Sequence, residues 1–233
     1  MGSVLALPSP LQHFWRGVKA EFPILIGVFP FGMIYGVLAL DAGIQPGAAQ
    51  AMSAIVFAGS SQLVTAQLVQ TGAPAFVIVL TIAIINLRHA LYSASVAEHV
   101  KKLNPFWKAL LAYLLTDEAY AVTITHYERN GSTKDGHWYF LGAGLALWST
   151  WQVSTALGIG MGAVIPANWS LDFFLALTFI ALVVPNLKDF PSLAAALAAG
   201  ATAVVAYNLP YKLDLVTAAL VGILTGSLLE RKK

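Results

Sequence analysis

The longest stretch of this chain without a charged side chain runs from Ala42 to Leu87, which is 46 residues. As one α-helix it would measure about 70 Å, more than twice the thickness of the hydrocarbon core of a bilayer. The stretch therefore has to turn back, and Thr71-Gly72-Ala73-Pro74 provides a turn signal within it. A soluble core could not hide a run of this length, so it predicts an integral membrane protein with several helical segments.

The composition agrees and excludes several other classes of protein. Hydrophobic residues make up 58% of the chain and charged residues only 10%, whereas soluble domains carry about 25% charged residues. A net charge of +2 gives no basic surface for nucleic acid, so we expect no nucleic-acid partner. The 233 residues include no cysteine, which excludes disulfides and thiolate metal sites. We expect no cofactor.

Polar patches divide the chain into eight expected membrane-embedded helical segments with short loops. We expect an all-α fold with a single transporter domain over residues 21–230, preceded by a cytoplasmic N-terminal segment over residues 1–20 that lacks a signal-peptide cleavage site. The expected segments are the run between Glu21 and Asp41, two segments between Ala42 and the polar patch at Glu98, and then Pro105–His126, a segment in Gly136–Leu171, Phe173–Leu187, Phe190–Tyr211 and Leu215–Leu229.

Segments two and six carry polar interruptions, at Gly59–Gln62 and at Pro185–Asn186, and can be broken or re-entrant. Eight full crossings would place eight basic residues inside and four outside, whereas two re-entrant segments would place nine inside and three outside. Similar spacing in 36–62 and 158–184 indicates an internal repeat, with chance similarity of apolar stretches as the alternative. Paired broken segments in matching halves are typical of transporter sites.

The most polar cluster inside an apolar run is Gly59-Ser60-Ser61-Gln62. Hydrogen-bonding groups are costly in such a run unless they pair or line a cavity, so these four are candidate substrate-binding residues. The alternative is that they pack helices together. Asn86 and Arg88 are further candidates for binding substrate. The guanidinium of Arg88 can bind a carboxylate through two hydrogen bonds. Alternatively, Arg88 extends to the membrane interface.

Two adjacent acidic residues, Asp117 and Glu118, lie near the middle of the fourth segment and are candidates for proton coupling. Burial disfavours an ionised carboxylate and so permits proton exchange. Because successive helical residues point about 100° apart, we expect one carboxylate to pair with Arg88 and the other to face a cavity. The alternative is a helix end at the interface. His89 is a third coupling candidate because histidine titrates near neutral pH, and a structural role is its alternative.

Trp148 and Trp151 lie one helical turn apart inside a long apolar run and are candidate walls of a substrate pocket. The alternative is an interfacial aromatic belt. Asn186, in the second interruption, is the remaining substrate-binding candidate. The chain contains no zinc-protease, nucleotide-binding or dinucleotide-binding signature, so we do not expect an enzyme. A serine hydrolase built on Ser60 or Ser61 would lack the expected glycine-flanked serine.

Several blocks resemble, in order and spacing, the AzlC-type family, the large subunits of bacterial branched-chain amino acid exporters. The resemblance implies a multi-pass protein of the bacterial cytoplasmic membrane that exports valine, leucine, isoleucine and, as a further substrate, methionine. It also implies a small, separately encoded membrane partner of the AzlD type. The blocks are Phe57-Ala58-Gly59-Ser60-Ser61-Gln62, Asn86-Leu87-Arg88-His89-Ala90-Leu91-Tyr92, Thr116-Asp117-Glu118-Ala119-Tyr120, Leu171-Asp172-Phe173 and Leu182-Val183-Val184-Pro185.

The candidate residues suit such a substrate. Arg88 can meet the carboxylate of an amino acid, Asp117 or Glu118 its ammonium group, and the tryptophans or Phe57 its apolar side chain. Without an ATP-binding motif, we expect transport to be driven by an ion gradient, with proton antiport as the leading form. The alternatives are a passive channel, an assembly subunit that carries no substrate and, least favoured, an intramembrane serine hydrolase.

Overall fold

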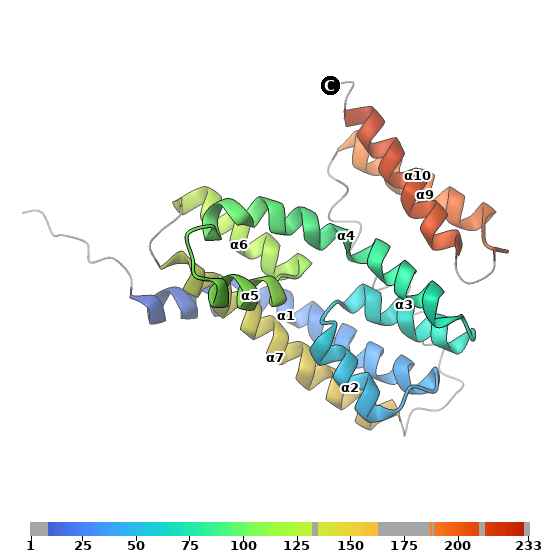
Figure 1. The fold of residues 1–233 in the computed structure, drawn as a ribbon, viewed down its shortest axis with the longest axis horizontal. Coiled ribbons are helices and arrows are strands. Elements are labelled where there is room, and N and C mark those ends of the chain that lie inside the picture. Colours follow the sequence, from blue (N-terminus) through green and yellow to red (C-terminus); the bar gives the residue numbers. More distant parts are fainter. Residues whose placement is uncertain (1–8, 132–134, 163–186, 188, 210–212, 231–233) are drawn as a thin grey trace, which may run out of the picture. The chain divides into compact units, whose positions relative to one another are not determined.

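The computed structural model describes residues 9–131, 135–162, 187, 189–209 and 213–230. These residues form nine α-helices and contain no strand, which confirms the all-α fold class (Figure 1). In chain order the helices are α1 (Pro10–Asp41), α2 (Pro46–Ile55), α3 (Gly59–Gln70), α4 (Ala75–Val100), α5 (Pro105–Tyr113), α6 (Asp117–Asn130), α7 (Gly136–Gly162), α9 (Phe190–Val205) and α10 (Leu213–Glu230).

The chain divides into two compact units. Unit 1 takes its residues from 1–63 and 85–164, and unit 2 from 64–84 and 165–233. Within unit 2, α9 packs along α10. Of the described helices, α1, α4 and α10 are long and apolar enough to cross a membrane. The single transporter domain over 21–230 and the cytoplasmic position of residues 1–20 stay predictions.

Helix α1 is the main packing element of unit 1. It begins with Ser9 as N-cap, whose side chain accepts a hydrogen bond from the backbone N–H of Gln12, and with Pro10 in the first turn. It packs against α7 more extensively than any other pair of described helices, and α2 and α6 also lie against it. All candidate residues that the structure describes belong to unit 1.

Small residues let the backbones of α1 and α7 approach closely. A Cβ atom added at Gly158 of α7 would lie 2.1 Å from the carbonyl oxygen of Met33 in α1. In the reverse direction, a Cβ at Gly36 would lie 2.5 Å from the carbonyl oxygen of Thr155. No side chain fits at such distances, so this helix pair depends on glycine.

Replacing Gly158 by alanine is therefore expected to destabilise the protein by about 1–3 kcal/mol, because the backbones must separate. Gly160 is the matched control, since a Cβ there meets nothing within 4 Å. Gly160→Ala should be neutral or slightly stabilising, because alanine favours a helix. Thermal unfolding of both variants in detergent measures the difference. Equal melting temperatures for the two would contradict this packing.

The second expected segment is broken, as the sequence predicts, but slightly earlier than expected. Helix α2 ends at Ile55 and α3 begins at Gly59, so the break lies at Val56–Ala58. Phe57 has a φ of 42°, in the left-handed region, which turns the chain there. The polar cluster Gly59–Gln62 forms the first turn of α3 rather than the interruption itself.

The fourth expected segment is not one helix, and this prediction was wrong. Helix α5 ends at Tyr113 and α6 begins at Asp117. Thr116 is the N-cap of α6, and its side chain accepts a hydrogen bond from the N–H of Ala119. Acidic residues in the first turn favour a helix start, so Asp117 and Glu118 open a helix instead of interrupting one. The break in segment six and the second copy of the expected repeat fall largely outside the described residues.

Candidate functional site

Arg88, near the middle of α4, joins the starts of two other helices. Its Nη1 donates a hydrogen bond to Oδ2 of Asp117, the first residue of α6, and forms an ion pair with it. Its Nη2 donates to Oγ of Ser60, the second residue of α3. The side chains of Arg88 and Asp117 are about one third exposed, at 31% and 37%. Three candidates far apart in sequence thus meet at one place in unit 1.

The two partners of this ion pair each keep one unused polar atom. Nε of Arg88 and Oδ1 of Asp117 are buried and have no hydrogen-bond partner among the described residues. The pair therefore has one buried donor with positive charge and one buried acceptor with negative charge that make no hydrogen bond by geometry, and Tyr92 is a close neighbour of Asp117. Since a buried polar group gains by acquiring a partner, this arrangement suits a ligand that carries both charges.

The other three residues of the polar cluster are fixed by neighbouring helices. Ser61 donates to Oδ1 of Asn86 on α4 at 2.6 Å. The side-chain oxygen of Gln62, which is fully buried, accepts from the indole N–H of Trp151 at 3.0 Å. A Cβ atom at Gly59 would lie 2.9 Å from the ring of Trp151, so glycine lets the start of α3 approach α7 closely.

Trp151 is enclosed by protein and does not belong to an interfacial belt. Its exposed fraction is 4%. Its ring lies 5.8 Å from that of Phe31 and is stacked with that of Tyr35 at 6.2 Å, both on α1. The indole N–H of Trp148 donates to the hydroxyl of Tyr113 at 2.6 Å. The sequence alone does not identify Phe31, Tyr35 or Tyr113, because aromatic residues in apolar helices carry no signal of their own.

A second polar network, which the sequence does not predict, connects α2 to α7. Gln50 donates to the side-chain oxygen of Gln152 at 2.7 Å, and Gln152 donates to the carbonyl oxygen of Ser53 at 3.1 Å. The hydroxyls of Ser53 and Thr155 lie 2.9 Å apart and share a hydrogen bond. This network holds the helix before the Val56–Ala58 break in place.

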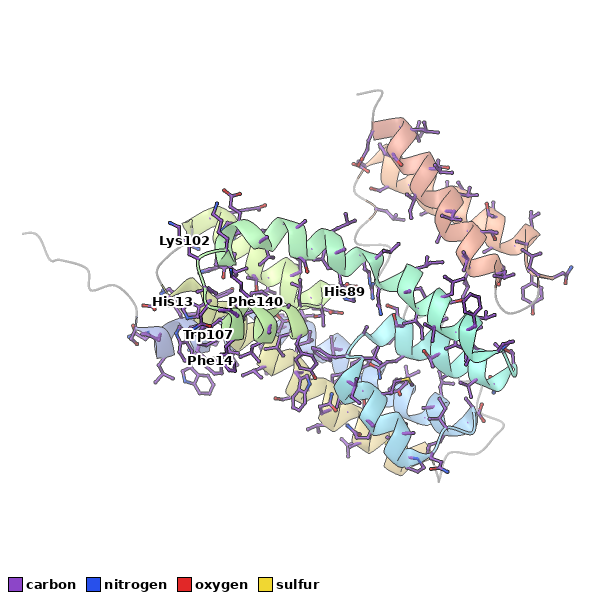
Figure 2. All side chains as sticks on the ribbon, viewed as in Figure 1. His13, Phe14, His89, Lys102, Trp107 and Phe140 are labelled. Atoms are coloured by element: carbon purple, nitrogen blue, oxygen red, sulfur yellow. The ribbon has the colours of Figure 1, made fainter. Side chains whose placement is uncertain are left out.

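His89 and Glu118 lie next to the ion pair in sequence but take no part in it. Asp117 is the acidic residue that forms the ion pair with Arg88. His89 lies midway along α4 (Figure 2), with its ring 6.0 Å from that of Tyr92. Tyr92 in turn stacks on Tyr120 of α6 at 4.5 Å. Asn186, the remaining candidate, lies outside the described residues.

Comparison with known proteins identifies a family of membrane proteins. The AzlC protein family model matches residues 23–165, which is more than half of the chain. The chain belongs to the AzlC family. Among its relatives, the inner membrane protein YgaZ of Escherichia coli (strain K12) is 28% identical over 98% of this chain and 94% of that protein. No solved structure matches.

Two further AzlC relatives extend the comparison. An uncharacterized membrane protein of Archaeoglobus fulgidus is 30% identical, over 94% of this chain and 96% of that protein. The branched-chain amino acid transport protein AzlC of Bacillus subtilis (strain 168) is 25% identical, over 74% of this chain and 69% of that protein. The chain is thus a multi-pass protein of the cytoplasmic (inner) membrane, in a family associated with transport.

Proposed function

We propose that the chain is the large subunit of a secondary transporter that exports branched-chain amino acids across the cytoplasmic membrane. The observation that carries the proposal is the Arg88–Asp117 ion pair, which lies where α3 and α6 begin. In this pair, Nε of Arg88 and Oδ1 of Asp117 make no hydrogen bond with the described residues. The printed name of the Bacillus subtilis relative supports the substrate class. Valine, leucine and isoleucine are the proposed substrates, with methionine as a fourth.

The carboxylate of the amino acid is proposed to bind Arg88 at the start of α3. The first backbone N–H groups of a helix have no partner within it, and the helix dipole places partial positive charge there. Ser60 already connects Arg88 to this helix start. Transporters commonly place the N-termini of broken helices against the anionic group of a substrate.

The ammonium group and the side chain of the substrate have separate proposed contacts. The unused Oδ1 of Asp117 can accept a hydrogen bond from the ammonium group, because a buried carboxylate oxygen without a partner favours a cationic donor. The rings of Trp151 and Phe31 are buried against the start of α3 at Gly59, and they are the apolar groups proposed to contact a branched side chain when the site opens to substrate. Neither contact requires a cofactor.

The energy source and the partner complete the proposal. The sequence holds no ATP-binding motif, so a gradient drives export, and a proton is the ion that titratable residues beside the site suit best. A small membrane subunit of the AzlD type is proposed to complete the transporter. This follows from the family resemblance.

Exchange of labelled leucine across proteoliposomes that hold the chain with its small subunit tests the function. We expect valine, isoleucine and methionine to compete, and glutamate and lysine not to. A leucine analogue lacking the ammonium group, and one lacking the carboxylate, should each compete about a hundredfold less well, since each loses one charged hydrogen bond of about 1.5–3 kcal/mol. Exchange of charged amino acids with no exchange of leucine would contradict the proposal.

A further inference from the structure

A further carboxyl group is buried within unit 1, on α1, where the sequence suggested only the edge of the first apolar run. Glu21 has an exposed fraction of 0%. Neither of its carboxyl oxygens has a hydrogen-bond partner among the described residues. Because removing an unpaired carboxylate from water is very costly, a carboxyl in this position is stable as the neutral acid.

The groups that surround Glu21 come from the helices packed against α1, which are α7, α6 and α2. Glu118 of α6 and Tyr139 of α7 are close enough to interact with it electrostatically. Helix α2 contains no titratable residue. The basic residues Arg16 and Lys19, on α1 itself, have exposed side chains. Glu118 is thus a carboxyl group on a neighbouring helix that acts on Glu21 electrostatically.

The ion that this carboxyl suits is a proton. A metal ion would need a cluster of ligands, and the described part of the chain holds no group of three acidic, histidine or cysteine side chains that could bind one. A neutral acid facing a second carboxyl group can give up one proton, and two such groups in apolar surroundings do not both ionise readily. Glu21, fully buried and with both oxygens unpartnered among the described residues, therefore suits a proton.

Two histidines, one on α1 and one on α6, lie near each other toward the N-terminal end of α1. His13 lies two turns before Glu21 and is 5% exposed (Figure 2). Its ring lies 6.5 Å from that of His126 on α6, and His126 stacks on Tyr139 at 3.8 Å. Nδ1 of His13 and Nε2 of His126 are buried without partners among the described residues. Each ring thus keeps one nitrogen that no described residue occupies.

We propose that Glu21 is a proton-binding site of the transporter, which exchanges its proton with Glu118 and is reached from the N-terminal end of α1 through His13 and His126. The proposal rests on the transport function proposed above. In the exchange, the O–H bond of Glu21 breaks, an O–H bond forms on the Glu118 carboxylate, and Glu21 is left as a carboxylate. The Arg88–Asp117 pair is then free to bind the amino acid while its neighbour Glu118 changes charge.

The test compares Glu21→Gln with the parent transporter, each with its small subunit. Glutamine has nearly the shape of the neutral acid, so the variant should fold. Infrared difference spectra of the purified protein between acidic and alkaline pH should lose the carboxylic-acid C=O band of Glu21. In proteoliposomes, leucine flux driven by a pH gradient should fall about tenfold or more, while leucine counterflow without a gradient stays within about twofold.

Glu128→Gln is the matched control, because Glu128 lies on α6 with an exposed side chain. It should leave the spectra and both fluxes unchanged. If Glu21→Gln does not fold, Glu21→Asp replaces it, and the carboxylic-acid band should then move rather than disappear. The proposal would be overturned if Glu21→Gln kept the carboxylic-acid band, or if its pH-driven leucine flux equalled that of the parent. The infrared result needs no substrate, so it stands even if leucine proves not to be carried.

Discussion

Replacing Arg88 by lysine is expected to weaken leucine binding about a hundredfold, which corresponds to roughly 2.7 kcal/mol. Arg88 bonds Asp117 and Ser60 through two different nitrogens and keeps Nε unused. Lysine carries a single ammonium group and cannot hold both helix starts and a carboxylate in the same geometry. Isothermal titration of the detergent-purified transporter with leucine measures the change.

A matched control separates this effect from a general loss of positive charge. Arg129, at the end of α6, is exposed, and Arg129→Lys should bind leucine as the parent does. The Arg88→Lys protein should still be inserted and monodisperse, because the positive charge opposite Asp117 is kept. Binding by Arg88→Lys within about threefold of the parent would show that the guanidinium does not hold the substrate.

Replacing Asp117 by asparagine is expected to abolish both leucine counterflow and gradient-driven export. The substitution removes the charge opposite Arg88 and the acceptor proposed for the ammonium group. It should also destabilise the protein, by about 1–2 kcal/mol, because breaking an ion pair that is one third exposed costs less than breaking a buried one. Counterflow and thermal unfolding on the same preparation separate the two effects.

Glu118→Gln and a double variant serve as controls for Asp117→Asn. Glu118 has no part in the ion pair, so Glu118→Gln should keep counterflow and lose the response to a pH gradient. The variant with both Arg88→Gln and Asp117→Asn should recover stability, because neither charge is left unpaired, yet remain unable to exchange leucine. If Asp117→Asn exchanged leucine by counterflow at the rate of the parent, the ammonium contact would belong to another residue.

The sequence predicts the outline of the fold because hydrophobicity and length decide which segments enter a membrane. The apolar runs that become α1, α4, α9 and α10 are visible from the spacing of charges. The break between α5 and α6 is not, since no glycine or proline marks it between Pro105 and His126. Thr116 followed by two acidic residues is a helix-start signal, but the same letters also fit buried acids within one helix.

For the candidate site, the chemical type of the residues predicts which of them interact better than their spacing in the sequence does. A pairing between Arg88 and one of the two acidic residues follows from the scarcity of charge nearby, and the structure selects Asp117. The burial of Glu21 depends on packing against α6 and α7, which sequence spacing does not give. One signal was available: Glu21 lies four residues after Gly17, on the helix face that the close-packed glycines mark.

The central claim, that Arg88 binds the carboxylate of an apolar amino acid, has a direct test by solid-state NMR. Leucine labelled with ¹³C at its carboxyl carbon is bound to transporter labelled with ¹⁵N in its arginine side chains. We expect dipolar coupling that corresponds to a carbon–nitrogen separation of about 4 Å, as in an arginine–carboxylate pair, and its loss in Arg88→Lys. Bound leucine that shows no coupling to an arginine nitrogen, or the same coupling in Arg88→Lys, would contradict the claim.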